Sequence, residues 1–265
     1  MSCMGSYGRM RDITGIPILP LMTVYDFFLK RALDQLFYNL YWKSSFILVG
    51  TPSGVTLSPE GAQHGWKSDI QIPNQITWEP AYCQELDWIL SDAIDRHLND
   101  NNQGRSGVII RGVTRGIDQK DLLKYLKRQL RFKTSQTSLA LSDYPISGAT
   151  DETQVPSLED KEIFSSLRED VLKGAYYLID YRGYANYEPG DNVVHILSLG
   201  AMVTEAIEAS EKLLEKGIYA NVIVVTCTDL LVGNLAHEDN YQYLKTGLGL
   251  SGDLYLQPIV NGQAQ

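Results

Sequence analysis

Two side chains that could move protons stand close together in the sequence. Glu60 and His64 lie four residues apart in SPEGAQH, residues 58–64. A histidine titrates near neutral pH, and a carboxylate beside it can shift its pKa or contact a ligand. The two residues are therefore candidates for acid–base chemistry. The alternative is that His64 is an ordinary histidine of a surface loop.

The residues before this pair predict where it lies. FILV, residues 46–49, is a short apolar run bounded by Gly50 and Pro52, which is typical of a parallel strand covered on both faces. Ligands of open α/β sheets bind beyond the carboxyl ends of such strands. We therefore expect Glu60 and His64 at that edge of a sheet.

A helix is predicted over residues 25–41. Its apolar residues recur at helical spacing, with Lys30 and Arg31 on the opposite side. Tyr25 and Phe28 belong to the apolar side, so the pattern alone assigns them to core packing.

Beyond this region, helical and strand patterns alternate along the chain. The expected elements are a helix from Pro80 to the turn at 99–104, a strand at 108–110, short helices near 119–130 and 158–173, a strand at 193–199, a helix to Lys216 and a strand at 222–225. The last three would form a βαβ unit.

This alternation predicts an α/β fold of two tandem layered domains with mostly parallel sheets. We place a first domain at residues 1–118 and a second at 173–265. Between them, residues 119–172 are charged and partly rich in Ser and Thr, which indicates a linker with short helices.

Composition excludes several classes of partner. With 23 Lys and Arg against 32 Asp and Glu, the net charge of -9 offers no footprint for nucleic acid or anionic lipid. Three cysteines without paired spacing indicate neither a disulfide framework nor a zinc site. No run approaches the roughly 20 apolar residues of a membrane span. We therefore expect a cytoplasmic protein with no membrane partner and no metal ligands of its own.

The remaining candidates carry weaker signals. His97 on a helix face and His195 within a strand are expected to be structural, and His237 lies in a polar stretch. The turn at 198–201 could present backbone donors to an anion, although one glycine turn is a weak signal.

Four segments, in this order and spacing, resemble the homodimeric, thiamine-dependent decarboxylating component of pyruvate dehydrogenase and its transketolase-like relatives. They are PLMTVYDFF at 20–28, TPSGVTLSPEGAQH at 51–64, IPN at 72–74 and EPAY at 79–82. The resemblance continues through 108–115, 171–177 and 193–229. It implies a partial thiamine pyrimidine-binding domain followed by a transketolase C-terminal-like domain that is incomplete.

The resemblance also implies roles for the candidate residues. Tyr25 and Phe28 would contact the aminopyrimidine ring of thiamine diphosphate, and Glu60 and His64 would lie beside the thiazolium and the substrate. His64 would then handle protons or orient a 2-oxo acid, while the cofactor acts as the electron sink. The family has further histidines after this one, whereas GWKSD follows at 65–69 here, so the choice of substrate stays open.

Two parts of the family pattern are not found in this sequence. The glutamate that activates the cofactor is expected upstream of residues 1–20, and the domain that binds the diphosphate and Mg²⁺ is expected in a missing N-terminal half or a complementary chain. GDN at 190–192 lacks the second glycine of the family's GDG signature. We therefore expect a fragment that is not active alone.

The sequence thus predicts part of a thiamine-diphosphate-dependent pyruvate dehydrogenase that supplies the pyrimidine-side wall of the active site. Its expected partners are the missing half, a lipoyl acyltransferase component and another copy of itself. The alternatives are a transketolase-like ketol transferase and a truncated, non-catalytic dimerisation or regulatory module.

Overall fold

The computed structural model describes residues 1–53, 74–98, 107–134, 156–184 and 186–232. Its first sheet has four parallel strands in the order β1-β2-β4-β3. The strands are β1 (Leu21–Val24), β2 (Phe46–Gly50), β3 (Gln75–Trp78) and β4 (Gly107–Arg111). The two central strands, β2 and β4, are the apolar runs that the sequence predicts. Both are buried almost throughout, as expected for strands covered on both faces.

A second, three-stranded sheet has the order β5-β7-β6. Its strands are β5 (Ala175–Ile179), β6 (Val193–Ser198) and β7 (Tyr219–Val225). Strands β6 and β7 are parallel and are joined by η6 (Gly200–Met202) and α8 (Val203–Leu214), which is the predicted βαβ unit. Strand β5 pairs with β7 in the antiparallel direction. The α/β prediction is therefore confirmed, with a first sheet that is parallel and a second that is mixed.

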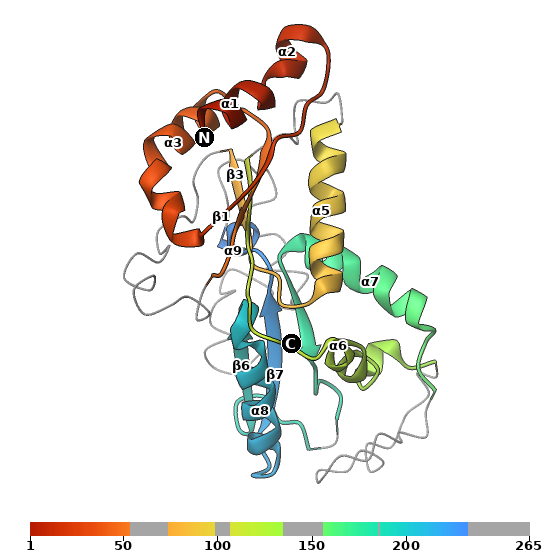
Figure 1. Ribbon diagram of the computed structural model, residues 1–265. Helices are drawn as coiled ribbons and strands as arrows, with labels where there is room; N and C mark the ends of the chain where they lie inside the picture. Colours follow the sequence, from red (N-terminus) through yellow and green to blue (C-terminus); the bar gives the residue numbers. More distant parts are fainter. Residues whose placement is uncertain (54–73, 99–106, 135–155, 185, 233–265) are drawn as a thin grey trace.

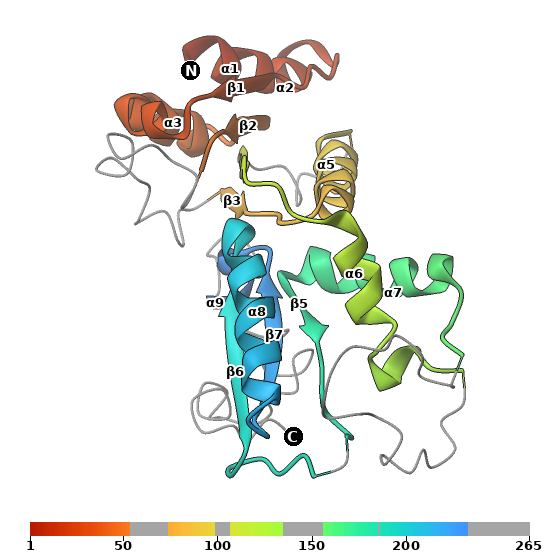
Figure 2. The same ribbon diagram turned by 60° about the horizontal axis from the view of Figure 1, so that its bottom comes forward.

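Helices cover the sheets and lie between them. Figures 1 and 2 show α1 (Ser2–Gly8), α2 (Met10–Thr14) and α3 (Leu33–Tyr41) together at one end of the molecule. Helix α5 (Cys83–Leu98) packs against α7 (Asp160–Lys173), and α6 (Gln119–Leu126) contacts β5. The chain also forms η4 (Leu130–Phe132) and α9 (Thr228–Val232).

The helices of the predicted linker are part of the core. One continuous cluster of buried side chains includes Leu122 of α6 and Ile163 and Leu167 of α7, together with residues from both sheets. Helices α6 and α7 match the expected positions. Their apolar side chains pack in the same cluster as residues of both sheets. The two sheets therefore pack into one body with a shared interior.

The predicted helix at 25–41 is only half right. Residues Asp26–Ala32 form a 3-10 helix, η1, and the α-helix begins at Leu33. The side chain of Asp26 turns inward and is buried, and the backbone of Ala32 leaves helical geometry at φ -116° and ψ 18°. Asp26 is therefore buried just after the end of β1.

In the described part of the chain, no helix combines the length and the apolar character that crossing a membrane requires.

Candidate functional site

Four polar side chains meet where the strands of the first sheet end. Asp26 follows β1, Ser53 follows β2, Glu79 directly follows β3, and Arg111 is the last residue of β4. The Arg111 guanidinium donates from Nε to Ser53 Oγ at 2.9 Å and from Nη1 to Glu79 Oε2 at 2.9 Å. Ser53 Oγ in turn donates to Asp26 Oδ2 at 3.1 Å. All four strand ends therefore converge on one cluster, at the edge where parallel sheets bind ligands.

The cluster contains two carboxylates and one guanidinium. Arg111 Nη2 lies 3.8 Å from Asp26 Oδ2, so both carboxylates share its charge. Burial raises the pKa of the Glu79 carboxyl, the Arg111 guanidinium lowers it, and Asp26 raises it again. The net result is a raised pKa, so Glu79 takes up a proton more readily than an ordinary glutamate.

Two glycines leave room for these carboxylates. A Cβ on Gly50 would lie 2.4 Å from Asp26 Oδ1, and one on Gly200 would lie 2.8 Å from Glu79 Oε1. Gly200 also has a φ of +46°, which favours glycine. The backbone at Gly50 of β2 and at Gly200 of η6 therefore packs closely against the acidic side chains.

The second sheet approaches the cluster by its carboxyl edge. The Glu79 amide donates to the Thr226 carbonyl oxygen at 2.8 Å, just after β7, and Gly200 lies just after β6. The Thr77 amide of β3 donates to Asp229 Oδ2 of α9 at 2.8 Å. The carboxyl ends of β6 and β7 in the second sheet thus meet the end of β3 around Glu79.

This contact bears on the turn at 198–201, where the sequence suggests an anion site. The carboxylate of Glu79 packs against Gly200, at the beginning of η6 and α8. The positive end of the helix dipole favours a negative charge at this position. The protein's own carboxylate therefore lies beside this turn.

Tyr25 and Phe28 stand on either side of Asp26 in the chain. Their rings meet edge to face with centroids 5.6 Å apart, and the Arg31 guanidinium lies 4.9 Å from the centre of the Phe28 ring. Phe28 is 43% exposed, whereas the neighbouring Leu29 is 2% exposed. Leu29 is therefore the core residue of this turn, and Phe28 is partly exposed.

Glu60 and His64 lie outside the described residues, as does His237. Ser53, the last described residue before residues 54–73, is a member of the cluster. The segment that carries both candidates thus leaves the sheet at the cluster. Their roles stay predictions.

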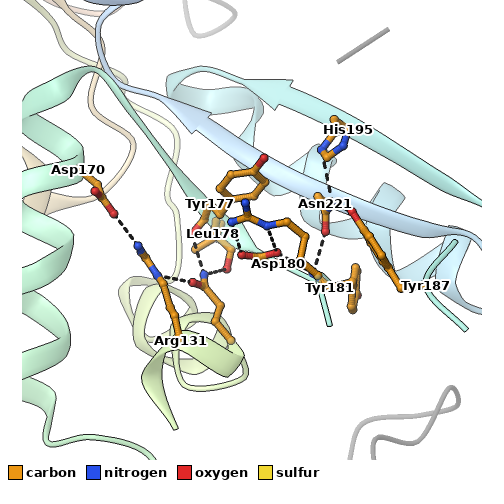
Figure 3. A network of polar contacts seen from close by, with 11 residues as sticks. Arg131, Asp170, Tyr177, Leu178, Asp180, Tyr181, Tyr187, His195 and Asn221 are labelled. Carbon is orange, nitrogen blue, oxygen red and sulfur yellow. Dashed lines mark hydrogen bonds and ion pairs between the residues drawn. The ribbon is translucent and has the colours of Figure 1, made fainter. Parts of the chain in front are cut away.

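The other two histidines lie inside the fold. His97 is buried, and its Nδ1 lies 2.7 Å from Ser45 Oγ. His195 is half buried on β6, where burial and Arg182 lower its pKa. Figure 3 shows His195 beside Asn221, which accepts from the Tyr181 amide at 2.7 Å and donates to the Tyr187 hydroxyl at 2.9 Å. Asn221 ties the segment after β5 to the sheet, so this network is structural.

Sequence reasoning missed the roles of Asp26, Glu79, Arg111 and Glu85. The first three stand in quoted segments without an assigned function. The pattern that could have found them is a charged residue within three positions of the end of an apolar or half-buried strand. VIIR at 108–111 is an example. Glu85 is wholly buried and accepts hydrogen bonds from the Ala81 and Tyr82 amides, which caps α5.

Within the described ranges, no group of three or more His, Cys, Asp or Glu side chains is placed to hold a metal ion.

Comparison with known proteins gives two kinds of similarity. No family model matches the chain. It is 36% identical over 86 residues to the pyruvate dehydrogenase E1 component of Buchnera aphidicola subsp. Baizongia pistaciae, an alignment covering 30% of this chain and 10% of that protein. The pyruvate dehydrogenase E1 component of Escherichia coli K12 is 30% identical over 94 residues, or 33% of this chain and 11% of that protein. The alignments thus span about a tenth of these curated relatives.

Solved structures of transketolases share the fold. A mutant transketolase from Pichia stipitis matches with a TM-score of 0.50 at 14% identity, over 85% of this chain and 25% of that one. A second mutant, in complex with fructose 6-phosphate, matches with a TM-score of 0.50 at 15% identity, over 83% and 24%. The chain therefore has a transketolase-like α/β fold and is similar in sequence, over about a third of its length, to pyruvate dehydrogenase E1 components.

Proposed function

We propose that this chain supplies the pyrimidine-side wall of the active site in a thiamine-diphosphate-dependent enzyme that decarboxylates a 2-oxo acid, with pyruvate as the substrate. The observation that carries the proposal is the convergence of four strand ends on Asp26, Ser53, Glu79 and Arg111, beside the exposed ring of Phe28. The sequence similarity to pyruvate dehydrogenase E1 components supports it.

The described residues fit one side of a flat, polar-edged ring. Phe28 is 43% exposed, and Tyr25 lies edge-on to it at 5.6 Å between centroids. Aromatic side chains stack on such rings and also contribute apolar area. Thiamine diphosphate, when bound, supplies the electron sink for decarboxylation. Tyr25 and Phe28 would hold its aminopyrimidine, while Mg²⁺ and the diphosphate would be held by another part of the enzyme.

Glu60 and His64 are proposed as the residues that move protons in this site. Their segment begins next to Ser53, and a histidine within hydrogen-bond reach of the substrate can donate or accept a proton near neutral pH. His64 would orient the 2-oxo acid or handle its protons, and Glu60 would set the charge beside it.

The surface around residues 7–42 supports a partner at this end of the molecule. Ten of the fifteen large apolar side chains that are exposed in the described part of the chain lie there. They are Tyr7, Ile13, Ile16, Ile18, Leu21, Phe28, Phe37, Tyr38, Tyr41 and Trp42. Large exposed apolar patches are typical of interaction surfaces. We propose that the diphosphate-binding part of the enzyme and a second copy cover it, and that the assembled enzyme serves a lipoyl acyltransferase.

Calorimetry with thiamine diphosphate tests the incomplete site. The isolated chain should bind the cofactor weakly or not at all, because it would contact only one side of the ring. Addition of the diphosphate-binding part should produce micromolar binding with Mg²⁺. Micromolar binding by the isolated chain would contradict the proposal that its site is one-sided.

The similarity in fold to transketolases favours a second candidate, ketol transfer between sugar phosphates. A third is a non-catalytic dimerisation or regulatory module. Turnover assays on the assembled protein separate the first two, and failure to turn over either substrate with cofactor bound would favour the third.

A further inference from the structure

The Arg111 guanidinium uses its forked shape to join strands that are apart in the sequence. Nε reaches Ser53 after β2, Nη1 reaches Glu79 after β3, and Nη2 faces Asp26 after β1. A lysine ammonium is one point of charge on a flexible stem and does not present this planar fork. Both the charge and the shape of Arg111 are therefore needed to hold the cluster as it stands.

Glu79 also contacts the segments that follow the strands of the second sheet. Its carboxylate is bound by Arg111 and lies against Gly200, while its amide is bound to the carbonyl oxygen of Thr226. Removing Arg111 would leave two largely buried carboxylates without their shared countercharge, which is strongly unfavourable. They would then move apart or take up water, and the contact with Gly200 would change.

We propose that the Arg111–Glu79 pair is a positioning device that holds the carboxyl edges of the two sheets together and, through Ser53, fixes the point where the segment carrying Glu60 and His64 leaves β2. The two residues act through their neighbours and do not themselves touch substrate. The link to Glu60 and His64 rests on the proposed function, whereas the link between the sheets does not.

The reactivity of Cys227 can be used to follow the contact between the two sheets. It directly follows Thr226, and its thiol is buried, whereas Cys3 and Cys83 are exposed. In a Cys3→Ser/Cys83→Ser background, Cys227 is the only thiol of the chain. Its rate of reaction with a disulfide reagent, in native buffer, then measures how often the two sheets part at this point.

The variants are Arg111→Lys, Arg111→Gln and Glu79→Gln. We expect each to raise the Cys227 rate at least about tenfold, because the pair no longer restrains the opening. Arg111→Lys keeps the charge, so it tests the fork while the two carboxylates keep a countercharge. In the Arg111→Gln background, Glu79→Gln should raise the Cys227 rate little further, because the two residues act as one unit. Arg131→Gln, which breaks the ion pair to Asp170 outside this junction, is the control and should leave the rate unchanged.

Rates within about twofold of the parent for all three variants would overturn the proposed link between the sheets. In the assembled enzyme, Glu79→Gln should lower kcat, since it displaces the segment that carries Glu60 and His64. Faster Cys227 reaction with unchanged kcat would overturn the link to the site. Faster reaction in an assembly that does not decarboxylate 2-oxo acids would reject the proposed function and leave the link between the sheets standing.

Discussion

The hydroxyl of Tyr176 on β5 donates a hydrogen bond to the carboxylate of Glu85 on α5, 91 residues earlier in the chain. Glu85 is wholly buried, and burial raises its pKa from 4.5 to about 7, although the hydrogen bonds from Tyr176, Ala81 and Tyr82 oppose this shift. The contact joins α5, beside the first sheet, to β5 of the second sheet. Its carboxyl group, that of Glu85, titrates near neutral pH.

The first prediction concerns the pH dependence of stability. Because the folded chain holds the Glu85 proton more tightly than the unfolded chain, the stabilisation is complete below pH 4.5 and is lost as pH rises through about 7. The loss amounts to roughly 3 kcal/mol for the shift from 4.5 to about 7. Glu85→Gln mimics the neutral acid and should abolish this component in urea unfolding between pH 4.5 and 8.

Glu162→Gln, on the exposed face of α7, removes the same charge and is the control. The free energy of unfolding of Glu85→Gln relative to the wild type should increase with pH. A relative value that does not change with pH would contradict the raised pKa of Glu85.

The second prediction compares two glycines with positive φ. Gly200→Ala strains the backbone at φ +46° and drives a methyl group to 2.8 Å from Glu79 Oε1 and 2.9 Å from Val113 Cγ1. Gly217→Ala strains the backbone at φ +77° but meets nothing within 4 Å. We expect a loss of about 1 kcal/mol for Gly217→Ala and about 2 to 4 kcal/mol for Gly200→Ala in chemical unfolding. Equal losses would mean that Glu79 does not press against Gly200.

The third prediction separates packing from ligand contact in η1. Leu29→Ala should destabilise the fold by about 2 to 5 kcal/mol, because Leu29 is buried. Phe28→Ala should cost only about 1 kcal/mol, since much of its ring is exposed. In the assembled enzyme, Phe28→Ala should weaken thiamine diphosphate binding about tenfold by calorimetry, the loss of a stacked ring. Unchanged affinity would remove Phe28 from the cofactor site.

The sequence predicts the long, apolar elements of this fold well. Strands β2, β4 and β7 are apolar runs of the kind buried in parallel sheets, and α8 has clear helical spacing. Strands β1, β3 and β5 were missed. Strands β1 and β3 have four residues each, and LMTV and QITW include polar residues that leave no uniform apolar run.

The cluster could not be predicted because it depends on strand order. Strand β3 pairs with β4 and not with β2, so Glu79 and Arg111 become neighbours across the sheet although they lie 32 residues apart. Nothing local in the sequence specifies that pairing. By contrast, Tyr25 and Phe28 are close in sequence, and their contact follows from one turn of the chain.

Turnover by the assembled protein tests the central claim most directly. With thiamine diphosphate and Mg²⁺, the chain and its diphosphate-binding part should reduce an artificial electron acceptor when pyruvate is added. His64→Ala should lower this rate by about 10²-fold or more, as expected for the loss of a general acid or base. The same assembly should not transfer a ketol group from a sugar phosphate. Ketol transfer without pyruvate-dependent reduction, in a protein that binds the cofactor, would contradict the account.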